Sequence, residues 1–289
     1  VDLVDVAQDN AVAAGLVDAL MKKGIAVVGP TRAAGQIEWD KSWARKLLKK
    51  AGVPQPDYQI FGDFKTGIKY LRGQPNKAWF IKAAGLVEGK GALPAKNKAE
   101  AIERVKELKR FGSAAEKFLV EQWLVGEEFS TFVVSDGKDY QYIGAAQDNK
   151  RVNDFDEGEN TGGMGSFAPP LVLTAEIKRQ TDEIIKKTLE ELRKLGRSYK
   201  GVLYLGGMIV QEKNGSKVYV IEFNARWGDP EAQVILPSIK NDLYEIDQAI
   251  ISGKLNGLNL EIDKKVRVVI AAVAKGYPTD YSAIKGKKV

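Results

Sequence analysis

VYVIEFNARWGDPEAQ, residues 218–233, is the most informative stretch of this sequence. Its first half predicts a buried strand, because β-branched and aromatic residues dominate it. Its second half is crowded with polar side chains: Glu222, Asn224, Arg226, Asp229 and Glu231. Charges at the end of an apolar strand are costly unless a partner compensates them. We therefore expect a strand that carries these groups to a ligand.

Glu222 and Asn224 are the first candidates for ligand contact. They are two residues apart on a predicted strand, so their side chains share one face. Hard oxygens at such a position can bind Mg²⁺ (or Mn²⁺), which would also contact substrate phosphates. The alternative interpretation is a strand end followed by a solvated turn.

The composition limits the chemistry that this chain can perform. Its 289 residues suggest about two domains, and they include no cysteine and no histidine. A thiolate nucleophile, a disulfide and a histidine base are therefore excluded. Phosphoryl transfer suits the remaining carboxylates, amides, lysines and arginines, because it depends on positioning and charge stabilisation.

The formal net charge of +6 does not indicate nucleic-acid binding. Lysine and arginine are mixed with acidic residues along the chain, whereas a nucleic-acid surface needs a basic stripe. A phosphate-bearing small ligand accounts for the excess equally well. The N-terminus lacks a signal-peptide pattern, and the apolar runs fall short of the roughly 20 residues of a membrane helix. We expect a cytoplasmic protein that binds neither nucleic acid nor membrane.

The pattern along the chain changes near residue 53. Residues 1–31 read as a β-α-β unit, and two helical pieces follow at 32–52, with Asp40 as an N-cap. A linker at 53–59 leads into α+β sequence. Further helices are expected at 63–72, 98–109, 174–195 and 230–251, the last broken at Pro237. Strands are expected at 78–82, 117–122, 128–135, 140–146, 201–211, 217–224 and 266–274.

Three further segments indicate a nucleotide site. WFIKAAGLVEGKGALPA, residues 79–95, brings Lys82 on a strand to a glycine-rich loop suited to phosphates. FLVEQWLVGEEFSTFVVSDG, residues 118–137, predicts a strand-to-hinge junction that offers main-chain groups to an adenine edge. Each has an alternative interpretation as a surface hairpin with solvated charges.

The third segment, QDNKRVNDFDEGENTGGMGSFAPP, covers residues 147–170. We expect a long polar loop there, and loops of this length are commonly functional or disordered. Its GGMG tract allows the backbone to approach a ligand closely. The alternative is a flexible surface loop.

Together these segments resemble the ATP-grasp superfamily and, within it, the glycinamide ribonucleotide synthetase (phosphoribosylamine–glycine ligase) family. The matching pieces follow the family's order over nearly the whole chain: AAGLVDAL, VVGPTRAAGQIE, IKAAGLVEGKGA, VEQWLVGEEFS, AQDNKR, ENTGGMGSFAPP, IEFNARWGDPEAQ and KGYPTDY. The resemblance implies an α/β plus α+β chain, in which two α+β lobes surround ATP. The implied parts are a partial N-terminal α/β domain (1–53), a core (54–262, small lobe 54–125 and large lobe 126–262) and the start of a C-terminal domain (263–289).

The resemblance also implies a reaction. ATP would phosphorylate the carboxylate of glycine, and the amine of phosphoribosylamine would attack the acyl phosphate. ATP and Mg²⁺ (or Mn²⁺) are the implied cofactors, and the two substrates are the implied small-molecule partners. This route needs no protein nucleophile, which agrees with the absence of cysteine and histidine. The oligomeric state is left open between a monomer and a weak dimer.

Residue roles follow from the matching motif positions. The implied ATP contacts are Lys41, Lys82, Gly89, Lys90, Gly91, Glu121, Trp123, Leu124 and Glu128, with Glu121 and the backbone near 123–124 at adenine and Glu128 at the ribose. Glu222 and Asn224 would hold the metal. Arg226, Asp229, Lys150 and Arg151 are the implied catalytic residues. The implied substrate contacts are Asp9, Asp148, Asn160, Thr161, Gly162 and Gly163.

The sequence departs from the family pattern on the substrate side. Residues 7–12 read AQDNAV where the family has GPE-PL, so Asp9 replaces a glutamate. Asn149 replaces a histidine and Glu159 a proline, and the family's early glycine-rich phosphate loop has no counterpart. We therefore expect a divergent or truncated member. Two alternatives are a ligase with a different amine acceptor and a nucleotide-binding relative without turnover.

Overall fold

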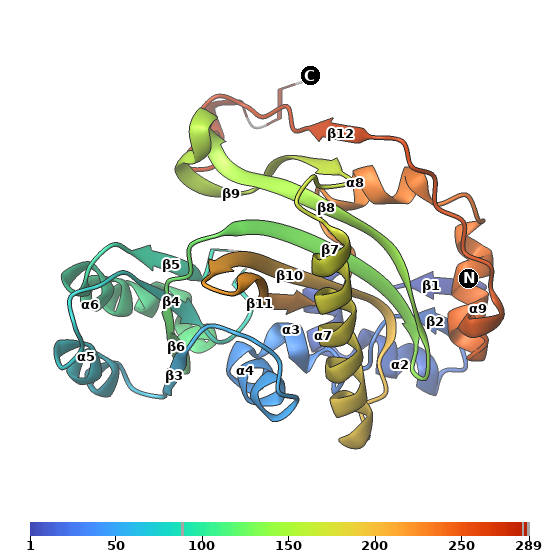
Figure 1. The fold of residues 1–289 in the computed structure, drawn as a ribbon, viewed down its shortest axis with the longest axis horizontal. Coiled ribbons are helices and arrows are strands. Elements are labelled where there is room, and N and C mark those ends of the chain that lie inside the picture. Colours follow the sequence, from blue (N-terminus) through green and yellow to red (C-terminus); the bar gives the residue numbers. More distant parts are fainter. Residues whose placement is uncertain (88–89, 285, 288–289) are drawn as a thin grey trace.

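The computed structural model describes residues 1–87, 90–284 and 286–287. Within these residues the strands form three sheets of two, four and six strands, with helices packed on their faces (Figure 1). Gly89 of the predicted phosphate loop lies outside the described residues. None of the helices in this described part combines the length and apolar character needed to cross a membrane.

The N-terminal unit has the predicted β-α-β order. Strands β1 (Leu3–Asp5) and β2 (Ala26–Val28) pair in parallel. The predicted single helix between them is divided into α1 (Asp9–Ala14) and α2 (Leu16–Lys22). The break lies at Gly15, whose φ of +84° ends α1 in the left-handed region that favours glycine.

The segment after β2 contains two short helices, α3 (Gln36–Trp39) and α4 (Lys41–Lys50). Asp40 caps α4 as predicted, because its side chain accepts a hydrogen bond from the backbone N–H of Trp43 at 3.0 Å. This α3–α4 segment lies against the large sheet (Figure 1).

The small lobe is built on a four-stranded antiparallel sheet in the order β3-β6-β4-β5. Its elements are β3 (Tyr58–Phe61), α5 (Phe64–Arg72), β4 (Trp79–Ala83), β5 (Ala92–Ala95), α6 (Lys98–Glu107), η1 (Leu108–Ala115) and β6 (Phe118–Gln122). Sequence analysis missed β3 and β5. Both are short, β3 follows a proline-rich linker, and β5 contains Pro94 at the sheet edge, where a missing N–H is tolerated.

The large sheet has six antiparallel strands in the order β11-β10-β7-β8-β9-β12. Their bounds are β7 (Glu127–Asp136), β8 (Tyr140–Asn153), β9 (Glu157–Ala168), β10 (Lys200–Glu212), β11 (Gly215–Asn224) and β12 (Arg267–Ile270). Residues 123–126 connect β6 of the small sheet to β7 of this sheet. The surface-hairpin alternative for 118–137 is therefore wrong, and the segment is a junction between lobes, as predicted. The exact domain boundaries stay a prediction.

The long polar loop predicted at 147–170 is wrong. Strand β8 continues to Asn153 and pairs with β9, so that Arg151 lies opposite Asn160. A short turn, η2 (Asp154–Asp156), closes this β8–β9 hairpin (residues 147–168). The reason is that a sheet ladder is made by backbone groups, so polar side chains are compatible with a strand wherever they meet solvent or a polar partner.

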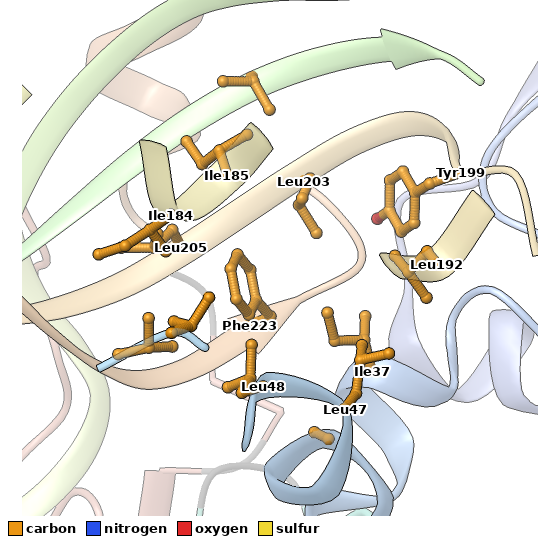
Figure 2. Packing of buried hydrophobic residues seen from close by; sticks show 14 of the residues in the cluster. Ile37, Leu47, Leu48, Ile184, Ile185, Leu192, Tyr199, Leu203, Leu205 and Phe223 are labelled. Carbon is orange, nitrogen blue, oxygen red and sulfur yellow. The ribbon is translucent and has the colours of Figure 1, made fainter. Parts of the chain in front are cut away.

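Two cores cover the faces of the large sheet. One face packs on α4 and α7 (Ala175–Lys194), and Figure 2 shows Leu48, Ile184, Leu205 and Phe223 meeting there. The other face packs on α8 (Ala232–Ile235), η3 (Leu236–Ser238) and α9 (Leu243–Ser252). The predicted break at Pro237 is confirmed, since η3 separates α8 from α9. Two more short helices are η4 (Leu255–Gly257) and η5 (Ser282–Ile284).

Candidate active site

A pocket lies where the α3–α4 segment, the small lobe and the end of β11 meet. Six residues selected from the sequence line it: Asp9, Lys41, Glu121, Glu222, Asn224 and Arg226. Glu38 and Arg45, which sequence analysis did not select, line it as well. The pocket therefore joins charged groups from three distant parts of the chain.

Strand geometry explains why Glu222 and Asn224 face this site. They flank Phe223, whose ring packs in the opposite core (Figure 2). Because successive side chains alternate, the two polar residues share the other face. Asn224 pairs with Tyr204 and Glu222 with Gly206 on β10. The same face continues across the sheet through Glu128, Ser130, Asp148 and Lys150.

Glu222 is held in its charged form. Burial opposes ionisation, but Lys150, Lys41 and Lys82 outweigh it, so the pKa of Glu222 lies below its usual value. A charged carboxylate and the amide oxygen of Asn224 thus share one face of the pocket.

Glu121 is the centre of a buried ion cluster. Its two carboxylate oxygens accept hydrogen bonds from Arg45 at 2.6 and 2.9 Å, and Lys82 Nζ lies 2.9 Å from Oε2. Burial opposes ionisation, yet Arg45 and Lys82 lower the pKa of Glu121 to about 2. The carboxylate therefore fixes two cations at the pocket, and its expected contact with adenine stays a prediction.

Glu38, which is buried, and Arg226, whose side chain is 26% exposed, form a second ion pair. Arg226 Nε lies 3.1 Å from Glu38 Oε1, and Glu38 Oε2 accepts a hydrogen bond from the backbone N–H of Ala225 at 2.8 Å. Burial raises the pKa of Glu38 to about 7, although Arg226 opposes this. Arg226 is thereby held beside the pocket directly after the strand that carries Asn224.

A third charged group lies further along the same sheet face. Lys150 Nζ is 3.3 Å from Glu128 and 3.7 Å from Asp148. Burial raises the pKa of Asp148 to about 6, against the charge of Lys150. Next to this group, the hydroxyl of Tyr204 donates to Glu231 at 2.7 Å. Glu231, the last charge of the opening stretch, is therefore used inside the protein.

The remaining substrate-side predictions fall on the β8–β9 hairpin. Thr161 Oγ1 donates to the carbonyl of Lys150 and accepts from the N–H of Gly163, both at 3.0 Å. Gly163 has a φ of +133°, and a Cβ there would collide with Pro230. This contact joins the TGGMG tract to the Asp229–Pro230 turn, where Asp229 accepts from Gln233 at 2.8 Å.

These substrate-side residues do not line the pocket itself, although the charge of Lys150 acts on Glu222, which does. Of the described residues that line the pocket, none is Lys150, Arg151, Asp148, Asp229 or a member of 160–163. Arg151 is half-buried on the hairpin and donates to the carbonyl of Gly158 at 2.7 Å. The structure thus brings the predicted metal ligands together with Lys41 and Glu121 of the predicted nucleotide contacts, and it places most of the predicted substrate contacts on a neighbouring element.

The predicted nucleotide loop and hinge lie at the small-lobe side of the pocket. The carbonyl of Gly91 accepts from the N–H of Ala83 at 2.9 Å. A Cβ on Gly91 would collide with Val87, which lines the pocket. Lys90 is exposed. At the hinge, the ring of Trp123 packs on Phe80 with centroids 4.7 Å apart, and Leu124 is buried.

Two of the missed residues, Glu38 and Arg45, carried a weak signal in the sequence. Arg45 falls on the apolar stripe of α4 with Ala44 and Leu48, and a charge at such a position indicates a buried partner. Glu38 stands between Ile37 and Trp39 in a helix too short to show periodicity.

Comparisons with known proteins agree with this site. The sequence matches the family described as phosphoribosylglycinamide synthetase, ATP-grasp (A) domain, over residues 39–232. It is 37% identical over 289 residues to a phosphoribosylamine–glycine ligase of Chlorobaculum tepidum, covering 99% of this chain and 67% of the relative.

Two solved structures show the same fold. The phosphoribosylamine–glycine ligase of Thermotoga maritima has a TM-score of 0.74 at 29% identity, covering 87% of this chain and 63% of that one. A biotin carboxylase of Campylobacter jejuni has a TM-score of 0.71 at 16% identity, covering 92% and 58%. The chain thus spans about two thirds or less of the length of these proteins.

Two lobes built on antiparallel sheets around a pocket of lysines, arginines and hard oxygens define an ATP-grasp fold. Within that class, the chain belongs to the phosphoribosylglycinamide synthetase family. The resemblance recognised in the sequence is confirmed.

Proposed function

We propose that this chain carries the ATP-dependent step that joins glycine to phosphoribosylamine, giving glycinamide ribonucleotide, ADP and phosphate. The observation that carries the proposal is the pocket, where Lys41, Glu222 and Asn224 meet, with Lys82 held nearby by Glu121. The names of the relatives support the choice of reaction.

The donor set fits a hard divalent cation. Glu222 is ionised and shares a sheet face with the carbonyl-bearing side chain of Asn224. In the part of the chain that the structure describes, no three acidic, histidine or cysteine side chains gather around one point. Mg²⁺ commonly takes one or two protein oxygens and completes its shell with phosphates and water. Glu222 and Asn224 would hold Mg²⁺ (or Mn²⁺), which supplies charge neutralisation between phosphates.

The residues divide the reaction between them. Lys41 and Lys82 would bind the phosphates of ATP as point charges. The γ-phosphoryl group would pass to a carboxylate oxygen of glycine, giving glycyl phosphate and ADP. Arg226 and Lys150 would stabilise the negative charge that develops at the transferred group. The amine would then attack the acyl carbon, and phosphate would leave with the oxygen taken from glycine.

That oxygen provides a direct test. Glycine labelled with ¹⁸O in its carboxylate is incubated with the protein, ATP and phosphoribosylamine. We expect ADP release above a control without amine, and one ¹⁸O atom in each phosphate released. Unlabelled phosphate, or ADP release that does not depend on the amine, would contradict the proposal.

A second candidate is a carboxylate–amine ligase of the same kind with a different acceptor. Asp9, which lines the pocket where the family pattern has a longer glutamate, favours it. A screen of amines with labelled glycine separates the two candidates. Strict dependence on phosphoribosylamine excludes the second, and binding of ATP without turnover by any amine would favour a non-catalytic nucleotide-binding protein.

A further inference from the structure

Arg45 on α4 contacts both lobes of the molecule at once. Its Nε and Nη2 donate to Glu121 on β6 of the small sheet at 2.6 and 2.9 Å. Its Nη1 donates to the carbonyl of Val220 at 2.9 Å, and Nη2 donates to the carbonyl of Ile221 at 2.7 Å. Both carbonyls belong to β11 of the large sheet. Only 4% of Arg45 is exposed, so these contacts are shielded from water.

The two carbonyls mark an irregularity in β11. Gly206 on β10 pairs with Glu222, whereas Gly207 pairs with Val220, so Ile221 is an extra residue. Such a bulge leaves one residue outside the ladder and re-aims the side chains that follow. The side chains that follow are those of Glu222 and Asn224. Arg45 therefore binds the strand at the point that sets the direction of the predicted metal ligands.

β11 is also an edge strand of its sheet, so the outer backbone groups need partners. The N–H of Val220 donates to the carbonyl of Pro54 at 2.9 Å. The carbonyls of Val220 and Ile221 accept hydrogen bonds from the guanidinium of Arg45. An arginine suits this place because its planar fork has five donors in fixed directions, whereas a lysine has a single charged nitrogen.

Glu38 binds the strand on the other side of the ligands. Its Oε2 accepts from the N–H of Ala225 at 2.8 Å, and its Oε1 pairs with Arg226 at 3.1 Å. A cation on the carbonyls before Glu222 and an anion on the N–H after Asn224 thus hold the segment at both ends. Both come from the α3–α4 segment, which contributes no predicted metal ligand.

We propose that Arg45 and Glu38 are positioning residues for the divalent metal ion, and that they act through the direction of Glu222 and Asn224. The inference rests on the proposed nucleotide and metal chemistry of this pocket, but not on the identity of the amine. Partners that orient metal ligands commonly change metal affinity by about 10–100-fold when they are lost.

The first experiment measures metal dependence apart from turnover. A non-hydrolysable ATP analogue is titrated into the full chain by calorimetry at several Mg²⁺ concentrations. We expect Arg45→Lys to raise the Mg²⁺ concentration for half-maximal binding by about 10-fold or more. Glu38→Gln keeps an acceptor for Ala225 but loses the charge facing Arg226, so we expect a smaller rise of a few-fold.

Arg267→Lys is the matched control. Arg267 also makes a two-pronged contact with a carboxylate, Asp263, at 2.6 Å for both bonds, and it donates to the carbonyl of Pro237 at 2.9 Å. It lies outside the pocket lining. A general loss of stability would affect both lysine variants, whereas the proposal expects a change in Mg²⁺ dependence for Arg45→Lys alone.

A second experiment asks whether Arg45 acts through Glu222. In a double-mutant cycle, we expect Arg45→Lys to change Mg²⁺ dependence by less than about 2-fold when Glu222→Gln is already present. The positioning role would be overturned if the effects of Arg45→Lys and Glu222→Gln on Mg²⁺ dependence were independent, so that the double variant showed their product. Equal shifts in Arg45→Lys and Arg267→Lys would overturn it as well. These outcomes can be told apart from a failure of the ligase proposal. Normal ADP release without the expected shifts in Mg²⁺ dependence rejects only the positioning role. The expected shifts without ADP release reject only the ligase activity.

Discussion

The wall of the pocket and the β8–β9 hairpin carry the same kinds of charged side chain in opposite surroundings. In the wall, the side chains of Arg45 and Glu121 are 5% and 1% exposed, and the two charges are paired with each other. Beside it, Lys150 at the start of the hairpin and Glu128 on the adjacent strand β7 are 40% and 48% exposed and lie 3.3 Å apart. The wall is built from three segments distant in sequence, whereas the hairpin is built from neighbours.

The difference separates two tasks. Breaking a buried ion pair leaves a charge with neither water nor a partner and is therefore costly. This cost fixes the geometry of the wall. An exposed pair is worth about 0–1 kcal/mol, so the hairpin groups can exchange partners when a ligand arrives. We infer that the wall holds nucleotide and metal geometry, and that the hairpin adapts to the second substrate. Four predictions test this division, in order of expected size.

Glu121→Ala tests the wall most severely. The change leaves Arg45 and Lys82 buried without their shared carboxylate, so we expect the free energy of unfolding to fall by about 3–5 kcal/mol. Urea denaturation measures it. Arg151→Ala on the hairpin is the comparison, with an expected change within about 0.5 kcal/mol. Similar losses in both variants would remove the distinction between the two regions.

Glu222→Gln tests the chemistry of the wall. It removes the negative charge that faces Lys41, Lys82 and Lys150, and we expect Mg²⁺-dependent ATP turnover to fall about 100-fold, or roughly 2.7 kcal/mol. Steady-state kinetics across Mg²⁺ concentrations measure this. Glu212→Gln, at the exposed far end of β10, should leave turnover unchanged. Unaltered Mg²⁺ dependence in Glu222→Gln would remove the metal assignment.

Gly163→Ala tests the contact between β9 of the hairpin and the Asp229–Pro230 turn. The residue has a φ of +133° and no room for a Cβ beside Pro230, so we expect a loss of about 2 kcal/mol. Gly215→Ala is the control, because Gly215 has a φ of +115° but nothing within 4 Å of a new Cβ. The difference between the two variants measures the contact. Equal losses would mean that backbone strain alone accounts for the effect.

Asp148→Asn tests the boundary between the regions through pH. Burial raises the pKa of Asp148 from 3.8 to about 6. Between these values the unfolded chain loses its proton first, so the contribution of this group to stability is present below pH 4 and is lost as pH rises through 6. Relative to the wild type, we expect the free energy of unfolding of the variant to rise by about 2 kcal/mol between pH 4 and pH 8, since each pKa unit corresponds to about 1.4 kcal/mol. Thermal unfolding at both pH values checks it, and a constant difference would contradict the sign.

The sequence was sufficient for most strands of the large sheet, though not for β9, and for several charged residues of the wall, though not for Arg45 and Glu38. Strands such as β10 and β11 contain long β-branched and aromatic runs, and their ends carry Glu222 and Asn224 on one face because alternation is a local property. The helix cap Asp40 was predictable for the same reason, since a cap acts within one turn.

The hairpin and the ion clusters were not predictable in the same way. β9 contains glycines and polar residues, and only its pairing with β8 makes it a strand. Arg45 and Glu121 are 76 positions apart in the sequence, and no local pattern predicts the contact between them. Glu121 lines the pocket, and its expected contact with adenine stays a prediction; the sequence did not indicate that Arg45 and Lys82 bind its two carboxylate oxygens.

The bond from Arg45 to the carbonyl of Val220 joins residues 175 positions apart. During synthesis at about 5–20 residues per second, Arg45 is made roughly 9–35 s before the strand that it will hold. Glu38, whose partner Ala225 is 187 positions away, waits slightly longer. Until β11 is made, both charges on the α3–α4 segment remain without these partners. The pocket therefore cannot form before β11 has been made, and a nascent chain that stops before residue 220 has no complete site.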